Sequence, residues 1–447
     1  MTAPQEVKAG IGLQGKNLLD VSHPGMYCLP GGELSRSYFK AANWGLSPGF
    51  QWQFHIGAIV AKNLPTCCGI CSGSEGKEWT DMAYPLQMPE GAYHTITAPD
   101  YCAWPNLTLL PNGEIAAVVH NKPSHAGMEA DVELWVSSDA GDTWAQRSQI
   151  THHQPNTIRM NVAAGLNSKG ELIVLCAGHN RDPETGALLQ MPFATICCVS
   201  GDNGYSWEET SEAPPPPGLA RATPFGDIVI NGDELLVGYY TGKKEEGKLP
   251  ISSCHVLRSV DDGRTWEYLA TIAEQFSETP LFKAPDGTFL AAARNAWGPT
   301  ARADIPGSNS EPALVLHTSQ DQGRTWQQRY YLSNPLQHPA HFLQLADGRI
   351  LLTFGSRLEE LYGVVGRLSD DNGGTWSRPF TLIGGLMHRD CGYPSSVQLA
   401  NGEIVTAYYA RSAPWYQRYH MGVLRWRPAM VKVKMGSVWG QEREDRD

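Results

Sequence analysis

The chain has 447 residues, enough for one large domain or for two to three of ordinary size. Only 18% of the residues are charged, and the 46 glycines, 31 prolines and 14 tryptophans favour a turn-rich, all-β protein over a helical one. A net charge of −11 without a basic run argues against a nucleic-acid partner, and no segment reaches the roughly 18 apolar residues of a membrane-spanning helix.

Residues 1–92 form an N-terminal segment outside the repeats that follow. Its start lacks the apolar core of a secretory signal peptide, so we expect a cytoplasmic or already processed protein. Aromatic stretches such as SYFKAANWGL and FQWQFHIGAIV indicate either a cap or strands that complete a repeat. The stretch CCGIC at residues 67–71 contains a CxxC pair. A structural zinc needs about four ligands, and because no second pair exists we expect no metal and no other cofactor.

From residue 93 onward, six segments share one pattern: an apolar strand, a turn that contains glycine, and a second apolar strand. They are NLTLLPNGEIAAVVHN, VAAGLNSKGELIVLCAGHN, PFGDIVINGDELLVGYY, TPLFKAPDGTFLAAARN, HFLQLADGRILLTFGSR and SSVQLANGEIVTAYYAR. The turn glycines are Gly113, Gly170, Gly232, Gly287, Gly348 and Gly402. Glycine supplies the positive φ that tight turns need, so the pattern predicts six β-hairpins.

Five of the hairpins are followed by an eight-residue motif, Ser-x-Asp-x-Gly-x-Thr/Ser-Trp. The copies are SSDAGDTW, SGDNGYSW, SVDDGRTW, SQDQGRTW and SDDNGGTW, which begin at Ser137, Ser200, Ser259, Ser319 and Ser369. An apolar strand precedes each copy and the tryptophan begins another strand, so each motif is predicted to be a turn between the third and fourth strands of a four-stranded unit. Aspartate in such turns binds nearby backbone N–H groups. These five aspartates are therefore predicted to be structural rather than catalytic.

The sixth hairpin is followed by YHMGVLRWRP, which resembles a third strand without the motif. Repeats of about 40–60 residues are typical of propellers, and closure into a ring leaves few exposed strand edges. We therefore expect an all-β fold, a six-bladed β-propeller of four-stranded antiparallel blades with five motif turns. It is expected to span residues 93–428, with residues 429–447 as a C-terminal tail.

These motifs make the chain similar to the sialidase (neuraminidase) superfamily over roughly three quarters of its length. The eight-residue motif matches the Asp box, or BNR repeat, of that superfamily. It indicates the fold more strongly than the function, because propellers that only bind also carry it. The resemblance implies a glycoside hydrolase whose nucleophile is a tyrosine of blade 6, with a glutamate of blade 4 as its base, an exception to the usual pair of catalytic carboxylates.

A matching pair follows from aligning the hairpins on their turn glycines. The residues nine positions before the glycine are Trp104, Asn161, Thr223, Glu278, Pro339 and Tyr393. Glu278 and Tyr393 thus share one register on blades 4 and 6. A phenol whose pKa is near 10 attacks poorly at neutral pH unless a carboxylate accepts its proton. We expect Tyr393 to be the nucleophile, Glu278 its base, and Trp104 a substrate-binding residue.

The resemblance also implies three arginines that bind the substrate carboxylate, because a guanidinium matches a carboxylate with two hydrogen bonds. Arg294 and Arg357, at the ends of the second strands of blades 4 and 5, resemble two of them, and Arg367 is a rival of Arg357. The third is missing, since Ala103 in the stretch CAWP stands at its position. The candidate replacements are Arg159, Arg221 and Arg389.

An acid/base aspartate on the blade 1 loop is also implied, here within HNKPSHAGMEADVELW. Alignment by strand start favours Glu129, whereas residue type favours Asp131. His120 ends a strand that faces the expected funnel, where a histidine suits proton transfer near neutral pH, and His125 follows nearby. Further polar residues are expected at the rim: His179, Asn180, Arg181, His338 and His341. Such a rim suits a polar, anionic sugar.

Three functions remain open at this point. An exo-acting sialidase-type hydrolase would remove a terminal sialic acid or related acidic sugar from a glycan, with Glu129 or Asp131 protonating the leaving oxygen. A hydrolase or lyase for a neutral or uronic sugar, with His/Tyr acid–base chemistry, would account for Ala103. A non-catalytic glycan- or protein-binding propeller needs only the repeats, but the shared register of Glu278 and Tyr393 argues against it.

Overall fold

The computed structural model describes residues 86–219, 223–243, 251–295 and 312–431. This part of the chain is all-β, as expected, and its only helix is the short 3-10 helix η3 (Pro428–Met430). No helix within these ranges is long and apolar enough to span a bilayer. Most of the predicted N-terminal segment, with its CxxC pair, and most of the predicted tail lie outside the described residues.

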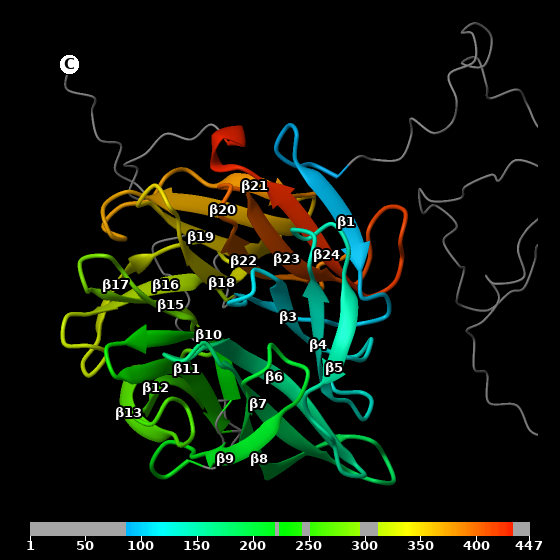
Figure 1. Ribbon diagram of the computed structural model, residues 1–447, viewed down its shortest axis with the longest axis vertical. Coiled ribbons are helices and arrows are strands. Elements are labelled where there is room, and N and C mark those ends of the chain that lie inside the picture. The colour runs from blue at the N-terminus through cyan, green and yellow to red at the C-terminus, as the bar shows by residue number, and fades with distance from the viewer. Residues whose placement is uncertain (1–85, 220–222, 244–250, 296–311, 432–447) are drawn as a thin grey trace, which may run out of the picture. The chain divides into compact units, whose positions relative to one another are not determined.

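Six four-stranded antiparallel units follow one another (Figure 1). Units 1 to 3 are β2 to β5 (Asn106–Leu109, Ile115–His120, Val132–Ser137, Ala145–Gln149), β6 to β9 (Thr157–Leu166, Leu172–Arg181, Leu188–Ser200, Glu208–Ala213) and β10 to β13 (Thr223–Asn231, Glu234–Lys243, Ile251–Ser259, Glu267–Glu274). Units 4 and 5 are β14 to β17 (Leu281–Lys283, Phe289–Arg294, Leu314–Ser319, Gln327–Tyr331) and β18 to β21 (Gln337–Gln344, Ile350–Ser356, Gly363–Ser369, Phe380–Ile383). Unit 6 consists of β22 to β24 (Cys391–Gln398, Ile404–Ala410, His420–Trp426) and β1 (Tyr93–Thr97). A short parallel pairing of β6 with β10 joins units 2 and 3 into one eight-stranded sheet.

Unit 6 takes its fourth strand from the other end of the described chain. Strand β1 pairs antiparallel with β24, with Thr95 opposite Val423, and Figure 1 shows β1 in blue beside β24 in red. The eight-residue motif is a turn between a third and a fourth strand. Unit 6 therefore lacks the motif because no turn joins β24 to β1.

The five motif turns share one hydrogen-bond pattern, which the turn between β12 and β13 illustrates. Ser259 Oγ donates to Asp261 Oδ1 at 2.8 Å, and Asp261 also accepts from the backbone N (2.9 Å) and the Oγ1 (2.6 Å) of Thr265. The tryptophan adds a hydrogen bond to the turn glycine in three of the five turns; here Trp266 Nε1 donates to the carbonyl oxygen of Gly263 at 3.1 Å. The aspartate side chain is thus engaged in hydrogen bonds within its own turn, which agrees with the predicted structural role.

The hydrophobic core lies between the units. One cluster of buried apolar residues separates each pair of consecutive units, and a further cluster contains Val119 of unit 1 together with Val423 of unit 6. The first strands of the units contact one another in chain order, and β22 also contacts β2. Because the first two strands of each unit are antiparallel, the start of the first strand and the end of the second lie at the same edge. The predicted site residues come from this edge.

Candidate active site

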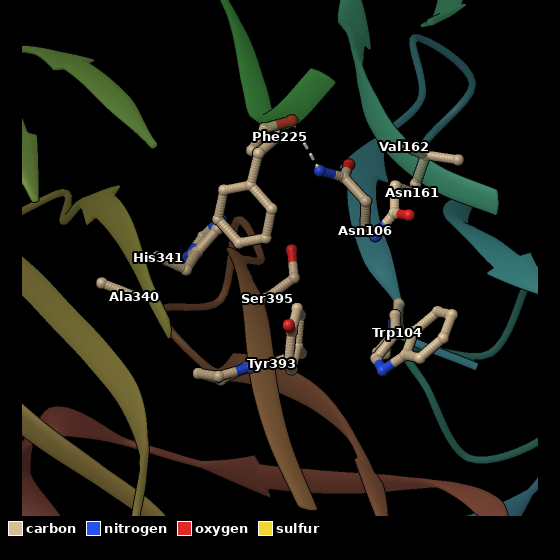
Figure 2. Close-up of a pocket in the computed structure, with 12 residues that line it drawn as sticks. Trp104, Asn106, Asn161, Val162, Phe225, Ala340, His341, Tyr393 and Ser395 are labelled. Carbon is tan, nitrogen blue, oxygen red and sulfur yellow. Dashed lines mark hydrogen bonds between the residues drawn. The ribbon is translucent and has the colours of Figure 1, made fainter. Parts of the chain in front are cut away.

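A pocket lies among the first strands of the units (Figure 2). Its walls come from units 1, 2, 3, 5 and 6: Trp104, Pro105, Asn106, Asn161, Val162, Phe225, Gly226, Ala340, His341, Tyr393, Pro394 and Ser395. Trp104, Tyr393 and the predicted rim residue His341 line it together, and the rings of Trp104 and Tyr393 have centroids 6.1 Å apart. Tyr393 also contacts Glu278, just before unit 4, and Arg357, just after the second strand of unit 5.

An irregular backbone directs these side chains. Trp104, Asn161 and Tyr393 have φ angles of 41°, 57° and 50°, in the left-handed region that residues other than glycine rarely adopt. The strand pairing shifts register just after Met160 in β6 and just after Gly392 in β22, which marks a β-bulge in each strand. A bulge re-aims a side chain out of the normal strand alternation. These three residues share one position before the turn glycine in the sequence, and in the structure they also share a left-handed backbone conformation.

Tyr393 and Glu278 meet in the structure. Tyr393 Oη donates a hydrogen bond to Glu278 Oε1 at 2.7 Å, and Arg294 Nη1 donates to the same oxygen at 2.8 Å. Burial raises the pKa of Tyr393 and the Glu278 carboxylate raises it further, so the phenol is protonated at neutral pH. Burial also opposes the charge of Glu278, yet the ion pair with Arg294 and its hydrogen bonds hold the pKa of this carboxyl below its usual range. A protonated phenol therefore faces an ionised carboxylate.

Arg357 lies over Tyr393 because two strands approach closely. Its Cζ is 5.8 Å from the centroid of the tyrosine ring. The approach occurs where Gly355 of β19 meets Gly392 of β22, since a Cβ on Gly355 would lie 2.9 Å from the Cα of Gly392. Within the described residues Arg357 forms no ion pair: its Nη2 contacts Tyr409 Oη at 3.5 Å, and its buried Nε has no hydrogen-bond partner. Burial opposes the charge of Arg357, whereas neighbouring groups that include the Asp390 carboxylate raise its pKa. Because its guanidinium has no direct ion-pair partner among the described residues, this position favours an anionic ligand.

A third arginine belongs to the same region. Burial and the positive charges of Arg294, Arg357 and Arg389 lower the pKa of His338 well below its ordinary value, so all three arginines act on this residue of β18. Arg389 is exposed and precedes β22. Ala103 is completely buried, which leaves no space for a guanidinium at that position. Of the candidate replacements, Arg389 is the one that the structure groups with the two expected arginines.

The other arginine candidates lie elsewhere or are not described. Arg159 is buried in its own unit, where Nη1 donates to the carbonyl oxygen of Ala194 at 2.5 Å and Cζ lies 4.2 Å from the centroid of the Phe193 ring. Arg367 is also buried and donates to two backbone carbonyl groups. Arg221 lies outside the described residues.

His120, predicted to face the funnel, is buried beneath Trp104 with the two rings stacked at 5.1 Å between centroids. Its Nδ1 and Nε2 lie 3.3 and 3.2 Å from the carbonyl oxygens of Arg159 and Ser124. Burial lowers the pKa of His120 to about 4, so the ring is neutral near pH 7. A buried neutral ring is poorly placed to protonate a substrate. His179 is buried as well, near the end of β7.

Glu129 and Asp131 turn toward the connection between β5 and β6 instead of the pocket. Glu129 accepts a hydrogen bond from the backbone N of Asn156 and lies 3.6 Å from His153 Nε2. The buried Asp131 carboxylate is bound by His153 Nδ1 at 2.7 Å and by Thr151 Oγ1 at 3.0 Å. Both carboxylates thus anchor the loop between β3 and β4 to the connection between β5 and β6.

The same loop carries a residue that the predicted catalytic set omitted, His125. Its Nε2 lies 2.9 Å from Asp390 Oδ1, and its ring meets Trp104 edge to face with centroids 4.9 Å apart. Asp390 also accepts hydrogen bonds from Tyr409 (2.5 Å) and Tyr419. Despite burial, these partners hold the pKa of Asp390 far below its usual range. No local signal links His125 to Asp390, because they are 265 residues apart.

Within the described ranges, no group of His, Cys, Asp and Glu side chains is arranged to hold a metal ion. The CxxC pair at residues 67–71 falls outside those ranges.

Solved structures share this architecture. The structure matches a protein of unknown function from Dyadobacter fermentans with a TM-score of 0.63 and 19% identity, covering 76% of this chain and 100% of that one. It matches the Hadza microbial sialidase Hz136 (TM-score 0.58, 16% identity, 74% of this chain and 66% of that one) and Trypanosoma rangeli sialidase in complex with sialic acid (0.55, 13%, 76% and 59%). The chain has a sialidase-like fold. No protein-family model matches the sequence, and no curated protein is significantly similar to it.

Proposed function

We propose that the six units are the blades of a closed six-bladed propeller, and that the protein is an exo-acting glycoside hydrolase of the sialidase type. It removes a terminal sialic acid or a related acidic sugar from a glycan. The observation that carries this proposal is the 2.7 Å hydrogen bond from Tyr393 Oη to Glu278 Oε1 beside the pocket. Packing of unit 6 against unit 1 and the likeness to sialidases support the propeller.

In the proposed mechanism the Tyr393 oxygen attacks the anomeric carbon while the bond to the leaving oxygen breaks, and Glu278 accepts the phenolic proton. Arg294 keeps Glu278 ionised until that transfer. Water then hydrolyses the glycosyl–tyrosine intermediate. A neutral nucleophile avoids repulsion by a substrate carboxylate. Glu129 and Asp131 are left out of this mechanism, because both are bound to the connection between β5 and β6.

Arg357 and Arg389 are the proposed carboxylate-binding residues. Arg357 is buried beside Tyr393, and its Nε has no hydrogen-bond partner among the described residues, so its guanidinium is available to the carboxylate of an acidic sugar, a group that a neutral sugar lacks. Arg389 takes the place of the arginine that is missing at Ala103. A pair of carboxylate-binding arginines favours an acidic substrate over a neutral one.

Release of 4-methylumbelliferone from its α-sialoside tests the proposal. We expect turnover by the wild type and a loss of about 10³-fold or more in Tyr393→Phe, since phenylalanine has no nucleophilic oxygen. Arg389→Gln should lower kcat/KM by about 10- to 100-fold, the equivalent of one charged hydrogen-bonding contact. Tyr205→Phe, on a side chain that is 67% exposed in another turn, is the matched control and should keep full activity. If the folded wild type releases nothing, the sialidase proposal fails and uronic-acid and neutral glycans are the next substrates.

A further inference from the structure

The loop between β3 and β4 brings His125 of unit 1 to the edge of unit 6. Anchors on both sides fix its course: His120 Nε2 lies 3.2 Å from the Ser124 carbonyl oxygen, and Arg181 Nη2 donates to the Gly127 carbonyl oxygen at 2.8 Å. His125 lies between these anchors, and its side chain is 47% exposed.

We propose that His125, positioned by Asp390, is the acid/base catalyst that exchanges a proton with the leaving oxygen of the substrate. The inference rests on the proposed function and names a residue for the step that Glu129 and Asp131 are not placed to perform.

Three observations carry the proposal. Nε2 of His125 lies 2.9 Å from Asp390 Oδ1, so the carboxylate orients the ring. The other ring nitrogen, Nδ1, has no hydrogen-bond partner in the described part of the chain, and the ring is partly exposed. Trp104 links the histidine to the nucleophile, because its ring contacts those of both His125 (4.9 Å between centroids) and Tyr393 (6.1 Å).

Trp104 itself offers an unused hydrogen bond at this place. Its side chain is nine-tenths buried, and its Nε1–H finds no acceptor among the described residues. A buried donor without a partner is costly. A sugar hydroxyl or ring oxygen that lies between Tyr393 and His125 is a suitable acceptor.

The proton balance closes over the two half-reactions. As Tyr393 forms its bond to the anomeric carbon, Glu278 takes the phenolic proton and the His125 imidazolium gives its Nδ1 proton to the departing oxygen, which leaves as an alcohol. Water then attacks the anomeric carbon and loses a proton to neutral His125. The Tyr393–carbon bond breaks and Glu278 returns the proton to the phenolate. Glycoside and water thus give free sugar and alcohol, with both catalytic groups restored.

The test compares leaving groups. An aryl α-sialoside expels a phenol that needs little protonation, whereas α-sialyl-lactose expels a sugar alcohol that needs it fully. His125→Gln should lower kcat/KM for α-sialyl-lactose by about 10²- to 10⁴-fold, the usual share of general acid catalysis, and that for the 4-methylumbelliferyl α-sialoside by less than about tenfold. Asp390→Asn should show the same preference to a smaller degree. The control is His152→Gln, whose exposed ring contacts Gln149 in unit 1.

A pH profile provides a readout that a structural role leaves unchanged. The titratable groups that face His125 are Asp390, Tyr409, Tyr419 and His120. We expect the pH profiles of kcat/KM for α-sialyl-lactose to differ in shape between wild type and His125→Gln, because the variant lacks the acid/base group. Profiles of the same shape would indicate a structural role.

The outcomes separate the two proposals. If the wild type turns over neither substrate, the sialidase function fails and the role of His125 falls with it. If the wild type is active but His125→Gln affects both substrates equally, or neither, the role of His125 alone is overturned. If His125→Gln loses kcat/KM selectively on α-sialyl-lactose, both the sialidase function and the role of His125 are supported.

Discussion

At Tyr393 the backbone adopts a φ of 50°, which costs a bulky residue about 1–3 kcal/mol. The neighbouring Gly392, with a φ of 109°, and its contact with Gly355 hold the strand in this shape. The contact also brings Arg357, two residues after Gly355, over the tyrosine ring. Two glycines, neither of which has a reactive side chain, therefore set the geometry of the proposed nucleophile, Tyr393.

This dependence predicts the effect of one added methyl group. In Gly355→Ala the new Cβ would lie 2.8 Å from the carbonyl oxygen of His338 and 2.9 Å from the Cα of Gly392, so β18 or β22 must shift. We expect a loss of about 1–3 kcal/mol in the free energy of unfolding from overpacking. Because small misplacements of reacting groups are costly, kcat/KM should fall by about 10- to 100-fold. In the control, Gly201→Ala, the nearest atom to the new Cβ is Glu171 Oε1 at 3.7 Å, and both quantities should stay unchanged. Unchanged activity and stability in Gly355→Ala would contradict the account.

At the scale of the element, the motif turns join the third and fourth strands of five of the six units with charged hydrogen bonds. In the turn between β16 and β17, Asp321 accepts from Thr325 N (2.8 Å), Thr325 Oγ1 (2.6 Å) and Ser319 Oγ (2.7 Å). These bonds lower the pKa of Asp321 from 3.8 to about 2. Since the folded-state pKa is the lower one, the stabilisation is complete above about pH 4 and is lost as the pH falls toward about 2.

Asp321→Asn should therefore destabilise the protein in a pH-dependent manner. At pH 7 we expect a loss of about 1 kcal/mol in the free energy of unfolding, a modest value because water competes at this exposed turn. The difference from wild type should shrink between pH 4 and pH 2, as the wild-type carboxyl becomes protonated. Urea unfolding at several pH values measures this. Asp370→Asn, at the exposed and variable second position of another motif turn, is the control and should show no such trend.

At the scale of the whole molecule, the pairing of β1 with β24 joins the two ends of the described fold. Thr95 and Val423 are directly opposite, and such pairs have Cα atoms about 4.5–5.5 Å apart, within reach of a disulfide. The double variant Thr95→Cys/Val423→Cys should form this bond on oxidation. Its oxidised form should exceed its reduced form by about 2–4 kcal/mol in the free energy of unfolding. The single variant Thr95→Cys, oxidised in the same way, is the control. Failure to cross-link, seen by mass spectrometry, would contradict the pairing.

Much of this architecture is predictable because its signals are local. The hairpin glycines and the motif turns repeat within short segments, so the all-β class and the place of each turn follow from the sequence. The register of Glu278 and Tyr393 holds for the same reason: both lie a fixed distance before a turn, and the structure brings them to 2.7 Å.

The features that sequence reasoning missed depend on contacts between distant segments. The partner of β24 lies at the other end of the described strands, so no spacing rule identifies β1 as the fourth strand. His120 was predicted from its place at a strand end, but the loop folds back over it and exposes His125 instead. The sequence does not distinguish Arg389 from Arg159 as the replacement for the missing arginine, because that depends on the direction in which each long side chain points.

The join between β1 and β24 also has a consequence in time. Of the described strands, the ribosome makes β1 first and β24 last. Roughly 320 residues separate the two strands, and their synthesis takes roughly 15–65 s at a typical 5–20 residues per second. Throughout this interval β1 has no partner strand, and its backbone donors and acceptors remain available to other chains. The nascent protein should accordingly be most prone to aggregation just before its synthesis is complete, and stable as soon as its last strand emerges.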